Sequence, residues 1–241
     1  ERRFPQPLSQ TRHIERERPG FPASRSAPPY RTSSAVNLRC MEFRALEIPG
    51  AWVFTPTLHH DARGLFLESF TRSSLREATG RSLELAQANV SVSSKGTIRG
   101  IHYALVPPGQ AKYVQCVSGS AFDVVVDVRA GSPTFGQWAS VILDTDKHSS
   151  IFLSEGLGHG FEALEEGTTL AYFCSTPYTP EREFGVNPFD PGLGISWPTV
   201  DGHLSEKDRA APDLSAALDQ GALPDYQECA DWMKTLLQRE G

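Results

Sequence analysis

Short stretches of alternating apolar and polar residues, separated by glycine- and proline-rich turns, run through most of the chain after residue 40. Alternation with a period of two predicts β-strands with one buried face, and many short strands predict a barrel or a two-sheet sandwich. The sequence therefore predicts an all-β fold, with expected strands at residues 45–55, 64–70, 83–93, 98–103, 112–117, 121–129, 137–143, 150–153, 160–164 and 168–175.

One short helix interrupts this series of strands. Residues 71–79 predict a helix with Ser73 or Ser74 as its N-cap and Gly80 as its C-terminal stop. The chain has no GxGxxG motif and no regular alternation of strands with helices. Both absences argue against a dinucleotide-binding domain.

The pattern turns helical near the C-terminus. Ser205 and Asp208 have the spacing of a capping box, and residues 225–239 are amphipathic. We therefore expect a β domain over residues 41–200 and a helical extension over residues 201–241 that packs on it.

Residues 1–40 differ in composition from the rest of the chain. They are rich in Arg, Pro and Ser and lack hydrophobic periodicity, so we expect a disordered leader outside the native fold, with Met41 as the natural start. They hold eight arginines and three glutamates, a net charge of +5, which leaves −11 on the remainder of a chain whose total is −6. This acidic body argues against nucleic acid as a partner.

Cysteine usage and hydropathy indicate a cytoplasmic protein. The four cysteines are scattered without a CxxC pair, which fits a reducing compartment rather than a disulfide framework or a zinc ribbon. Cys116 and Cys174 lie in apolar stretches, where we expect them to be buried. We find no secretory signal and no apolar run long enough to span a bilayer, so no membrane partner is expected.

Residues 98–117 bring potential chemistry into the β domain. Two predicted strands flank a Pro-Pro-Gly turn, with His102 near the end of the first and Lys112 at the start of the second. If the strands pair antiparallel, a general base and a fixed positive charge face one cavity. A structural histidine and a surface lysine are the simpler interpretation of this spacing alone.

Three further segments carry polar residues of interest. His159 lies in a glycine-rich turn, Tyr172 lies mid-strand, and the segment LSEKD holds Lys207 and Asp208. Each signal alone is weak: a buried tyrosine satisfied by one hydrogen bond is the ordinary explanation of Tyr172, and an aspartate that caps a helix is the ordinary explanation of Asp208.

Taken together, the motifs resemble a known family. DARGLFLESF, QANVSVSSKGTIRGIHY, PPGQAKYVQCVSGSAFDVVVDVRAGSPTFG, SEGLGHGF and DPGLGISWP followed by LSEKD are similar to segments of the dTDP-4-keto-6-deoxyhexose 3,5-epimerases, over about residues 41–218. QAN, GQAKYV and SEGLGHGF resemble the antibiotic deoxysugar branch. The resemblance implies a cupin-type jelly-roll sandwich, a cofactor-free isomerase and a homodimer that exchanges N-terminal strands.

The resemblance also implies roles for individual residues. His102 is the expected base, Asp208 orients and stabilises its imidazole, Tyr172 is the expected acid, and Lys112 neutralises the enolate. We expect Lys112 to lower the pKa of Tyr172. The residues expected to bind the nucleotide sugar are Arg63, Glu68, Gln87, Asn89, Arg99, His159, Glu183 and Lys207. Of these, Arg63 and Glu68 are expected to reach the site of a partner subunit.

Some positions depart from the family pattern. Ala88, Phe173 and Ala104 stand where the rhamnose enzymes usually carry Asp, Lys and Gln, and all three are expected beside the site. Ala104 also occupies a metal-ligand position of metal-binding cupins, so no metal site is predicted. The departures leave open which substituents the sugar carries and whether C3, C5 or both are inverted. The alternatives are a single-position epimerase, a non-catalytic nucleotide-sugar-binding cupin and a metal-dependent oxygenase.

Overall fold

The computed structural model describes residues 41–239, and the expectation of a disordered leader lies outside this range. The strands are β1 (Met41–Ala45), β2 (Ala51–Pro56), β3 (His59–Asp61), β4 (Gly64–Phe66), β5 (Gln87–Ser93), β6 (Ile98–Ala104), β7 (Lys112–Ser118), β8 (Ser120–Val126), β9 (Trp138–Asp144), β10 (Ser150–Leu153), β11 (Gly158–Ala163), β12 (Thr168–Cys174) and β13 (Glu183–Gly185). The helices are α1 (Arg72–Thr79), α2 (Glu206–Arg209), α3 (Leu214–Asp219) and α4 (Tyr226–Gln238).

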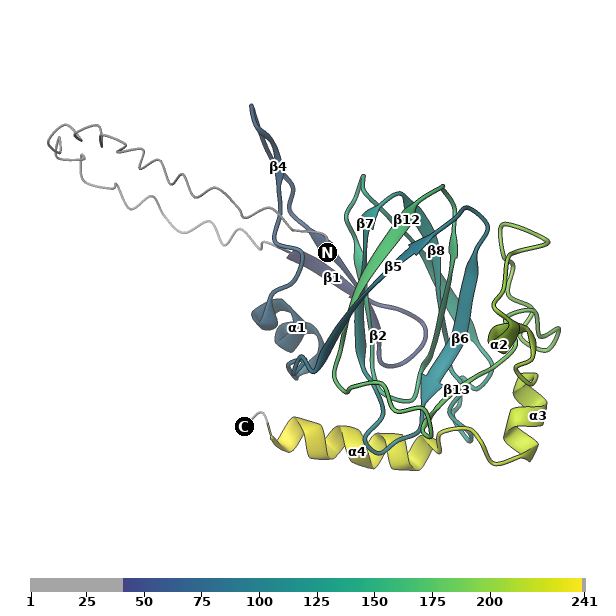
Figure 1. Cartoon of the computed structure of the whole chain (residues 1–241). Coiled ribbons are helices and arrows are strands. Elements are labelled where there is room, and N and C mark those ends of the chain that lie inside the picture. Colours follow the sequence, from purple (N-terminus) through teal and green to yellow (C-terminus); the bar gives the residue numbers. More distant parts are fainter. Residues whose placement is uncertain (1–40, 240–241) are drawn as a thin grey trace, which may run out of the picture. The chain divides into compact units, whose positions relative to one another are not determined.

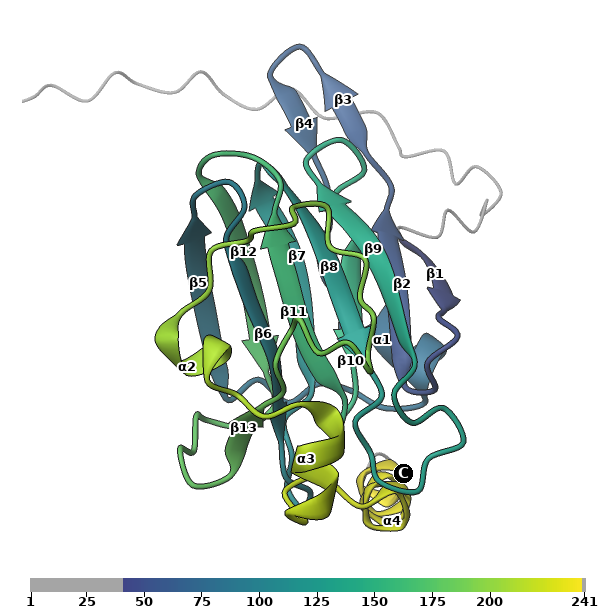
Figure 2. The same ribbon diagram turned by 90° about the vertical axis from the view of Figure 1, so that its right-hand side faces the viewer.

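Two antiparallel sheets face each other (Figures 1 and 2). A six-stranded sheet has the order β1-β2-β10-β7-β12-β5, and a five-stranded sheet has the order β13-β6-β11-β8-β9. Strands β3 and β4 form a separate hairpin that projects beyond the sheets (Figure 1). The all-β prediction is therefore confirmed.

Three apolar clusters hold the layers together. The cluster between the sheets combines Val114 and Leu170 of the six-stranded sheet with Val125 and Leu143 of the other. A second cluster lies on the outer face of the five-stranded sheet, under the segments that lead into and out of α3. A third lies on the outer face of the six-stranded sheet, where Leu75 of α1 covers it. Burial of these side chains supplies the main driving force for the sandwich.

Several predicted boundaries are wrong. The strand predicted over 45–55 begins only at Ala51, because residues 46–50 form a tight turn that reverses the chain, and strand β1, which was not predicted, precedes that turn and pairs with β2. The N-cap of α1 is Thr71 rather than Ser73 or Ser74, since the Ser74 amide donates to Thr71 Oγ1 at 3.3 Å. Gly80 ends the helix as predicted, with a left-handed φ of 79° that a glycine adopts without strain.

The expected pairing of residues 98–103 with residues 112–117 is also wrong. β6 belongs to the five-stranded sheet, with β11 and β13 as its neighbours, whereas β7 belongs to the six-stranded sheet between β10 and β12. The Pro-Pro-Gly segment is a crossing between the sheets, not a hairpin turn. Strand β13, which the sequence pattern did not predict, pairs with the end of β6.

The C-terminal segments lie against the β sandwich. Residues 197–205 cross the five-stranded sheet, bridged at Thr97 and His203, and lead into α2 (Figure 2). Ser205 Oγ accepts the Asp208 amide at 3.0 Å, as a helix N-cap does. Within residues 41–239, no helix is long and apolar enough to cross a membrane. The division into domains at residue 200 stays a prediction.

Candidate functional site

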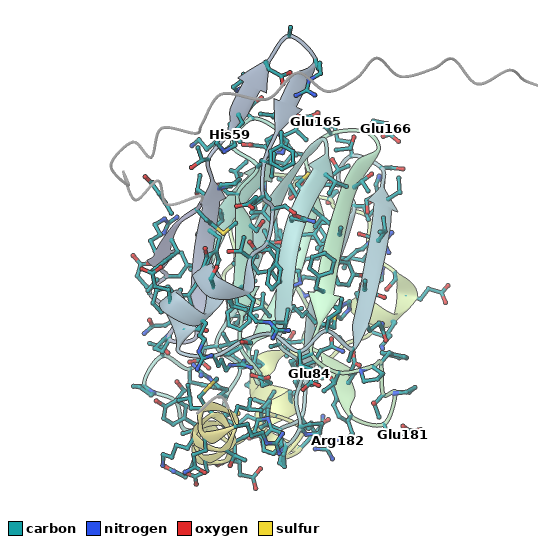
Figure 3. The ribbon with its side chains drawn as sticks, turned by 90° about the vertical axis from the view of Figure 1, so that its left-hand side faces the viewer. His59, Glu84, Glu165, Glu166, Glu181 and Arg182 are labelled. Atoms are coloured by element: carbon teal, nitrogen blue, oxygen red, sulfur yellow. The ribbon has the colours of Figure 1, made fainter. Side chains whose placement is uncertain are left out.

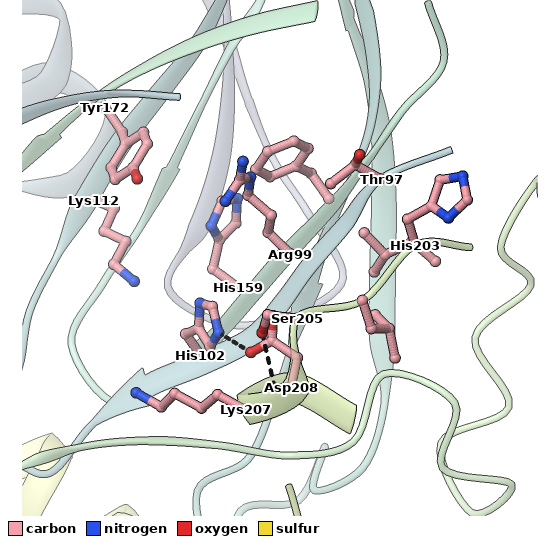
Figure 4. Close-up of a pocket in the computed structure, with 13 residues that line it drawn as sticks. Thr97, Arg99, His102, Lys112, His159, Tyr172, His203, Ser205, Lys207 and Asp208 are labelled. Atoms are coloured by element: carbon pink, nitrogen blue, oxygen red, sulfur yellow. Dashed lines mark hydrogen bonds and ion pairs between the residues drawn. The ribbon is translucent and has the colours of Figure 1, made fainter. Parts of the chain in front are cut away.

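A cavity of about 480 Å³ opens between the two sheets (Figure 4). Its lining residues are Thr97, Ile98, Arg99, His102, Lys112, His159, Phe161, Tyr172, His203, Leu204, Ser205, Lys207 and Asp208. An adjoining cavity of about 290 Å³ shares His102, Lys112, Tyr172 and Lys207 with it, and the two therefore form one continuous site. Seven residues predicted from the sequence to be functional thus surround the larger cavity.

His102 and Asp208 form a hydrogen-bonded pair in one wall of the site. His102 lies on β6 and is partly open to the cavity, whereas Asp208 lies on α2 and is buried. His102 Nε2 is 2.7 Å from Asp208 Oδ1. The Asp208 side chain therefore does not complete the predicted capping box. It turns from its own helix terminus to the histidine, which an isolated capping residue would not do.

The surroundings keep Asp208 ionised. Burial by itself would raise the pKa of the carboxyl group, but hydrogen bonds from His102 and Ser205 and from the Gly100 amide lower it below its ordinary value. An ionised carboxylate only accepts hydrogen bonds, so His102 Nε2 carries a proton, and in the neutral imidazole Nδ1 then holds the lone pair. This arrangement is suited to a general base.

A second histidine–carboxylate pair lies beside the first. His159 on β11 is the register partner of His102, and its Nε2 is 2.9 Å from Oδ2 of Asp123 on β8. Asp123 is fully buried, and its other oxygen, Oδ1, has no hydrogen-bond partner. Burial raises the pKa of Asp123, while the nearby His159 and Lys112 oppose that rise.

Lys112 and Tyr172 face these histidines from the opposite sheet (Figure 4). Lys112 lies at the start of β7 with only 9% of its surface exposed, and burial lowers the pKa of its ammonium group. Burial raises the pKa of Tyr172, and the cation that opposes this rise is Arg99. The expectation that Lys112 lowers the pKa of Tyr172 is therefore wrong, because burial of the phenol outweighs neighbouring charge.

Other predicted residues line the rim and the adjoining cavity. Arg99 is held by Ser93 Oγ, at 3.2 Å from its Nε, and Lys207 extends from α2 at the edge of the site. Gln87, Asn89 and Glu183 lie in the adjoining cavity. There Gln87 Nε2 donates to Asn89 Oδ1 at 2.9 Å, while Gln87 Oε1 accepts the Tyr178 amide.

Arg63 and Glu68 lie outside both cavities. Arg63 projects from the β3–β4 hairpin with its side chain 90% exposed, and it pairs with Asp61 of the same hairpin. Two of the departures from the family pattern also lie elsewhere than expected. Ala88 faces outward on β5, and Phe173 packs against Phe70 outside the sheet, 6.2 Å between ring centroids. Strand alternation turns both away from the site.

Sequence reasoning missed several residues of the site. Asp123, Thr97 and Tyr178 were not singled out, although each lines or supports the cavity. Asp123 left a signal in the sequence: it is the one charged residue within the apolar run AFDVVV. A charge in a buried strand needs a partner, and His159 is that partner.

Comparison with known proteins identifies the family. The family model described as dTDP-4-dehydrorhamnose 3,5-epimerase matches residues 45–216. A dTDP-4-dehydrorhamnose 3-epimerase from Streptomyces niveus is 51% identical over 78% of this chain and 91% of its own length. The solved rmlC epimerase of Mycobacterium tuberculosis is 49% identical, covers 81% of this chain and all of its own, and has a TM-score of 0.79.

A further solved structure, the 3'-monoepimerase ChmJ from Streptomyces bikiniensis in complex with dTDP-quinovose, has a TM-score of 0.78 and 47% identity. It covers 80% of this chain and 98% of its own. These likenesses confirm the cupin-type jelly roll and the resemblance read from the motifs, including the antibiotic-sugar relatives. Because the family model spans most of the described domain, the chain belongs to the dTDP-4-dehydrorhamnose 3,5-epimerase family.

Proposed function

We propose that this isomerase inverts C3, C5 or both in a dTDP-4-keto-6-deoxyhexose during deoxysugar biosynthesis, with His102, Asp208, Lys112 and Tyr172 as its catalytic residues. The observation that carries these roles is the His102–Asp208 pair, which faces Lys112 and Tyr172 across one cavity. Relatives named 3,5-epimerase and 3-epimerase are equally similar to this chain, each 51% identical. Sequence identity to these relatives therefore does not decide whether this chain inverts one carbon of the sugar or both.

Proton removal is the first chemical step. A C–H bond next to a ketone is weakly acidic, and a positioned base with a stabilised enolate makes its cleavage feasible. His102 Nδ1 accepts the proton, and the C–H electron pair moves into the enolate as charge develops on O4. The ionised Asp208 stabilises the resulting imidazolium.

Lys112 suits the stabilisation of that charge. Its ammonium group is buried and has no hydrogen-bond or ion-pair partner within residues 41–239. A cation already stripped of water interacts more strongly with an oxyanion than a hydrated one does. The negative charge on O4 is then balanced without solvent reorganisation.

Inversion requires the proton to return from the other face of the sugar ring. Tyr172 lies on β12 of the sheet opposite the histidines, and its raised pKa keeps the phenol protonated at neutral pH. It donates its proton to the carbon and then takes up a new proton from solvent. The base on one sheet and the acid on the other thus lie on opposite sides of the sugar ring.

The diphosphate of the substrate needs positive charges nearby. Because the chain after residue 40 is acidic overall, these charges must be clustered at the site. Arg99 and Lys207 stand at the rim, with Gln87, Asn89 and Glu183 in the adjoining cavity. Arginine and lysine suit a pyrophosphate through charge-assisted hydrogen bonds. We assign His159 to the sugar end of this site.

A homodimer with exchanged N-terminal strands completes the site. Phe66, with 66% of its surface exposed, lies with Arg63 on a hairpin that touches neither cavity of its own chain, and Glu68 follows the hairpin directly. Val90 and Val92 of β5 and Val117 of β7 are exposed on the six-stranded sheet. Figure 3 shows Glu165 and Glu166 at one end of this side of the molecule and Glu84 at the other. We propose that a second copy of the chain covers this face and receives the hairpin.

The enzyme that we propose is cytoplasmic. It uses no cofactor or metal and binds neither nucleic acid nor a membrane.

Substitution of His102 tests the proposed function. Incubation with dTDP-4-keto-6-deoxyglucose in deuterated water, followed by NMR, should give an inverted, deuterated product. His102→Asn should lower product formation by about 10²–10⁴, the usual contribution of a general base, while dTDP binds nearly as before. His148→Asn is the matched control, because His148 lies at a left-handed φ of 52° that Asn tolerates and lines neither cavity. Wild-type rates in His102→Asn would refute the assignment.

Mixed protomers test the dimer. Arg63→Ala and His102→Asn should each be poorly active alone. If hairpins are exchanged, a hybrid dimer holds one site with an intact body and an intact hairpin, so mixing the two variants should restore activity above either parent. A monomeric mass together with no recovery would contradict the exchanged dimer.

A further inference from the structure

A further cavity lies beside the C-terminal helix α4, at the end of the sandwich along which that helix runs (Figure 1). Its volume is about 270 Å³, slightly below the range of about 300–1,000 Å³ that is typical of ligand pockets, so it suits a small molecule. Its lining residues are Arg81, Ser82, Glu84, Pro108, Glu155, Ser175, Thr176, Trp232, Leu236 and Arg239. None of them lines the two cavities of the epimerase site, so this α4 pocket is separate from that site.

Two N–H donors of the α4 pocket lack acceptors. Trp232 Nε1 and Arg81 Nε are covered by protein and have no hydrogen-bond partner within residues 41–239. The indole N–H groups of Trp138 and Trp197, by contrast, each donate to a backbone carbonyl oxygen, at 3.1 Å and 2.7 Å. A covered donor without an acceptor loses its hydrogen bonds to water and gains none, so such groups are rare in native proteins. The two orphaned donors therefore point to a bound acceptor.

The acceptors that line the pocket are already engaged or lie in solvent. The Glu155 carboxylate pairs with the Arg81 guanidinium, and the two side chains are 5% and 4% exposed. Ser175 Oγ accepts a backbone amide at 2.8 Å, and the Thr176 hydroxyl donates to a backbone carbonyl at 2.9 Å. Glu84 is exposed at the rim, where water solvates its carboxylate. An acceptor for the Trp232 indole must therefore come from outside the chain.

Charge and apolar surface at the mouth of the pocket narrow the class of molecule. The exposed Arg239 guanidinium lies over the Trp232 ring, 5.3 Å from its centroid, and has no ion-pair partner within residues 41–239. Pro108, Leu236 and the indole ring supply apolar surface. A carboxylate suits the guanidinium and the N–H donor, and an apolar body attached to it would cover the rest of the wall.

We propose that the α4 pocket binds a small organic carboxylate with an apolar body. The carboxylate accepts a hydrogen bond from Trp232 Nε1, after the indole rotates toward the pocket, and pairs with the Arg239 guanidinium. The apolar body lies against Pro108 and Leu236. The Arg81–Glu155 pair stays intact and forms the buried end of the pocket. Binding at this site does not depend on the proposed epimerase function, because the two sites share no residue.

The indole signal of Trp232 tests the proposal. The isotope-labelled full chain is titrated with sodium benzoate, and the N–H signals of its four tryptophans are followed by two-dimensional NMR. Trp232→Phe identifies the Trp232 signal. This signal should move downfield and saturate with a Kd of about 1 mM or lower, which is reasonable for so small a ligand. The signals of Trp138 and Trp197 should stay in place, because their N–H groups are already bonded within the chain.

Matched variants and probes define the chemistry of the site. Arg239→Gln should raise the Kd for benzoate by at least about fivefold, because the charge-assisted pair is lost. Lys234→Gln removes an exposed cation of the same helix that pairs with Asp231, and it should leave the Kd unchanged. Benzamide keeps the shape and an acceptor oxygen but lacks the charge, so it should bind at least about fivefold more weakly than benzoate. Benzylamine, with a positive charge, should not move the signal.

Other results would overturn the proposal. A Trp232 signal that does not move, or that moves without saturation together with the other indole signals, would mean that water satisfies the indole. An unchanged Kd in Arg239→Gln would remove the guanidinium from the site. Equal shifts with inorganic phosphate would show an anion site that makes no use of the apolar wall. Displacement of benzoate by dTDP would place the probe in the substrate site instead of the α4 pocket.

Discussion

At the scale of single residues, the site is built from charges placed where burial is costly. Asp208 and Asp123 each recover part of that cost through a histidine. Lys112 has no such partner within residues 41–239, and the lowering of its pKa reflects the cost of burying the charged ammonium group. Active sites often trade stability for preorganised charge in this manner.

Removal of the Lys112 charge should therefore stabilise the protein. The folded-state pKa of Lys112 is lower than its unfolded value of about 10.4, so the ammonium form costs stability at neutral pH, and that cost disappears as pH rises above the unfolded pKa. We expect Lys112→Met to raise the free energy of unfolding at pH 7 by about 1 kcal/mol or more and to abolish activity. Urea unfolding at pH 7 measures the difference in the free energy of unfolding, and a less stable variant at that pH would show that the ammonium group stabilises the fold.

Tyr172 allows proton removal to be separated from proton return. Tyr172→Phe keeps the ring and its packing but removes the only group expected to donate from the second wall. We expect this variant to exchange substrate protons with solvent through His102, yet to form at least about 10²-fold less inverted product. NMR follows both in one sample. Equal losses of exchange and inversion would assign Tyr172 to binding or proton removal.

At the scale of elements, the segment before α2 determines where Asp208 lies. Backbone hydrogen bonds join His203 to the start of β6, with His203 N donating to Gly96 O at 2.8 Å and Ile98 N donating to His203 O at 3.0 Å. Buried Glu162 of β11 accepts the Thr199 amide at 3.2 Å. The segment is thus fastened to the strands that carry the two histidines, and the helix that follows it delivers Asp208 to His102.

Loss of the α2 cap should affect activity more than stability. Ser205→Ala removes the hydroxyl that accepts the Asp208 amide, which costs about 1 kcal/mol of local helix stability and loosens the His102 partner. We expect kcat to fall by about 3- to 10-fold, with little change in melting temperature. Asp213→Ala is the control, because the α3 N-cap makes no side-chain hydrogen bond and should have no effect. An equal kcat in the two variants would show that Ser205 does not position Asp208.

At the scale of the whole molecule, buried polar links join segments that are distant in the sequence. Arg81, just beyond α1, pairs with Glu155, just beyond β10, and their side chains are 4% and 5% exposed. The guanidinium also lies over the Phe152 ring, 5.4 Å from its centroid. The pair fixes the end of α1 against the base of the six-stranded sheet, away from the catalytic wall.

Breaking this pair should destabilise the fold without altering the chemistry. Glu155→Gln leaves the Arg81 charge buried and unbalanced, so we expect a loss of about 3 kcal/mol in the free energy of unfolding, with kcat per folded molecule retained. Asp231→Asn is the matched control, since the Asp231–Lys234 pair is exposed and should contribute about 0.5 kcal/mol or less. Chemical denaturation compares them. A similarly small effect in both variants would mean that Arg81 finds other partners or water.

The sequence by itself determined the fold class, the family and most members of the site. Strand alternation and glycine turns are local signals, and the resemblance of the motifs to a known family pointed to His102, Lys112, Tyr172 and Asp208 without any knowledge of strand pairing. Gly80 and Ser205 were readable as helix termini because capping depends on residues a few positions away.

Only the tertiary structure decided which strands meet and what each charge faces. Sheet assignment depends on long-range pairing, so β6 and β7 fell into opposite sheets and brought His102 and Lys112 together across a cavity rather than along a hairpin. The sign of the Tyr172 pKa shift depends on burial, which no local pattern reports. The pairing of Asp123 with His159 joins residues 36 positions apart on neighbouring strands, a contact that exists only after the sheet has formed.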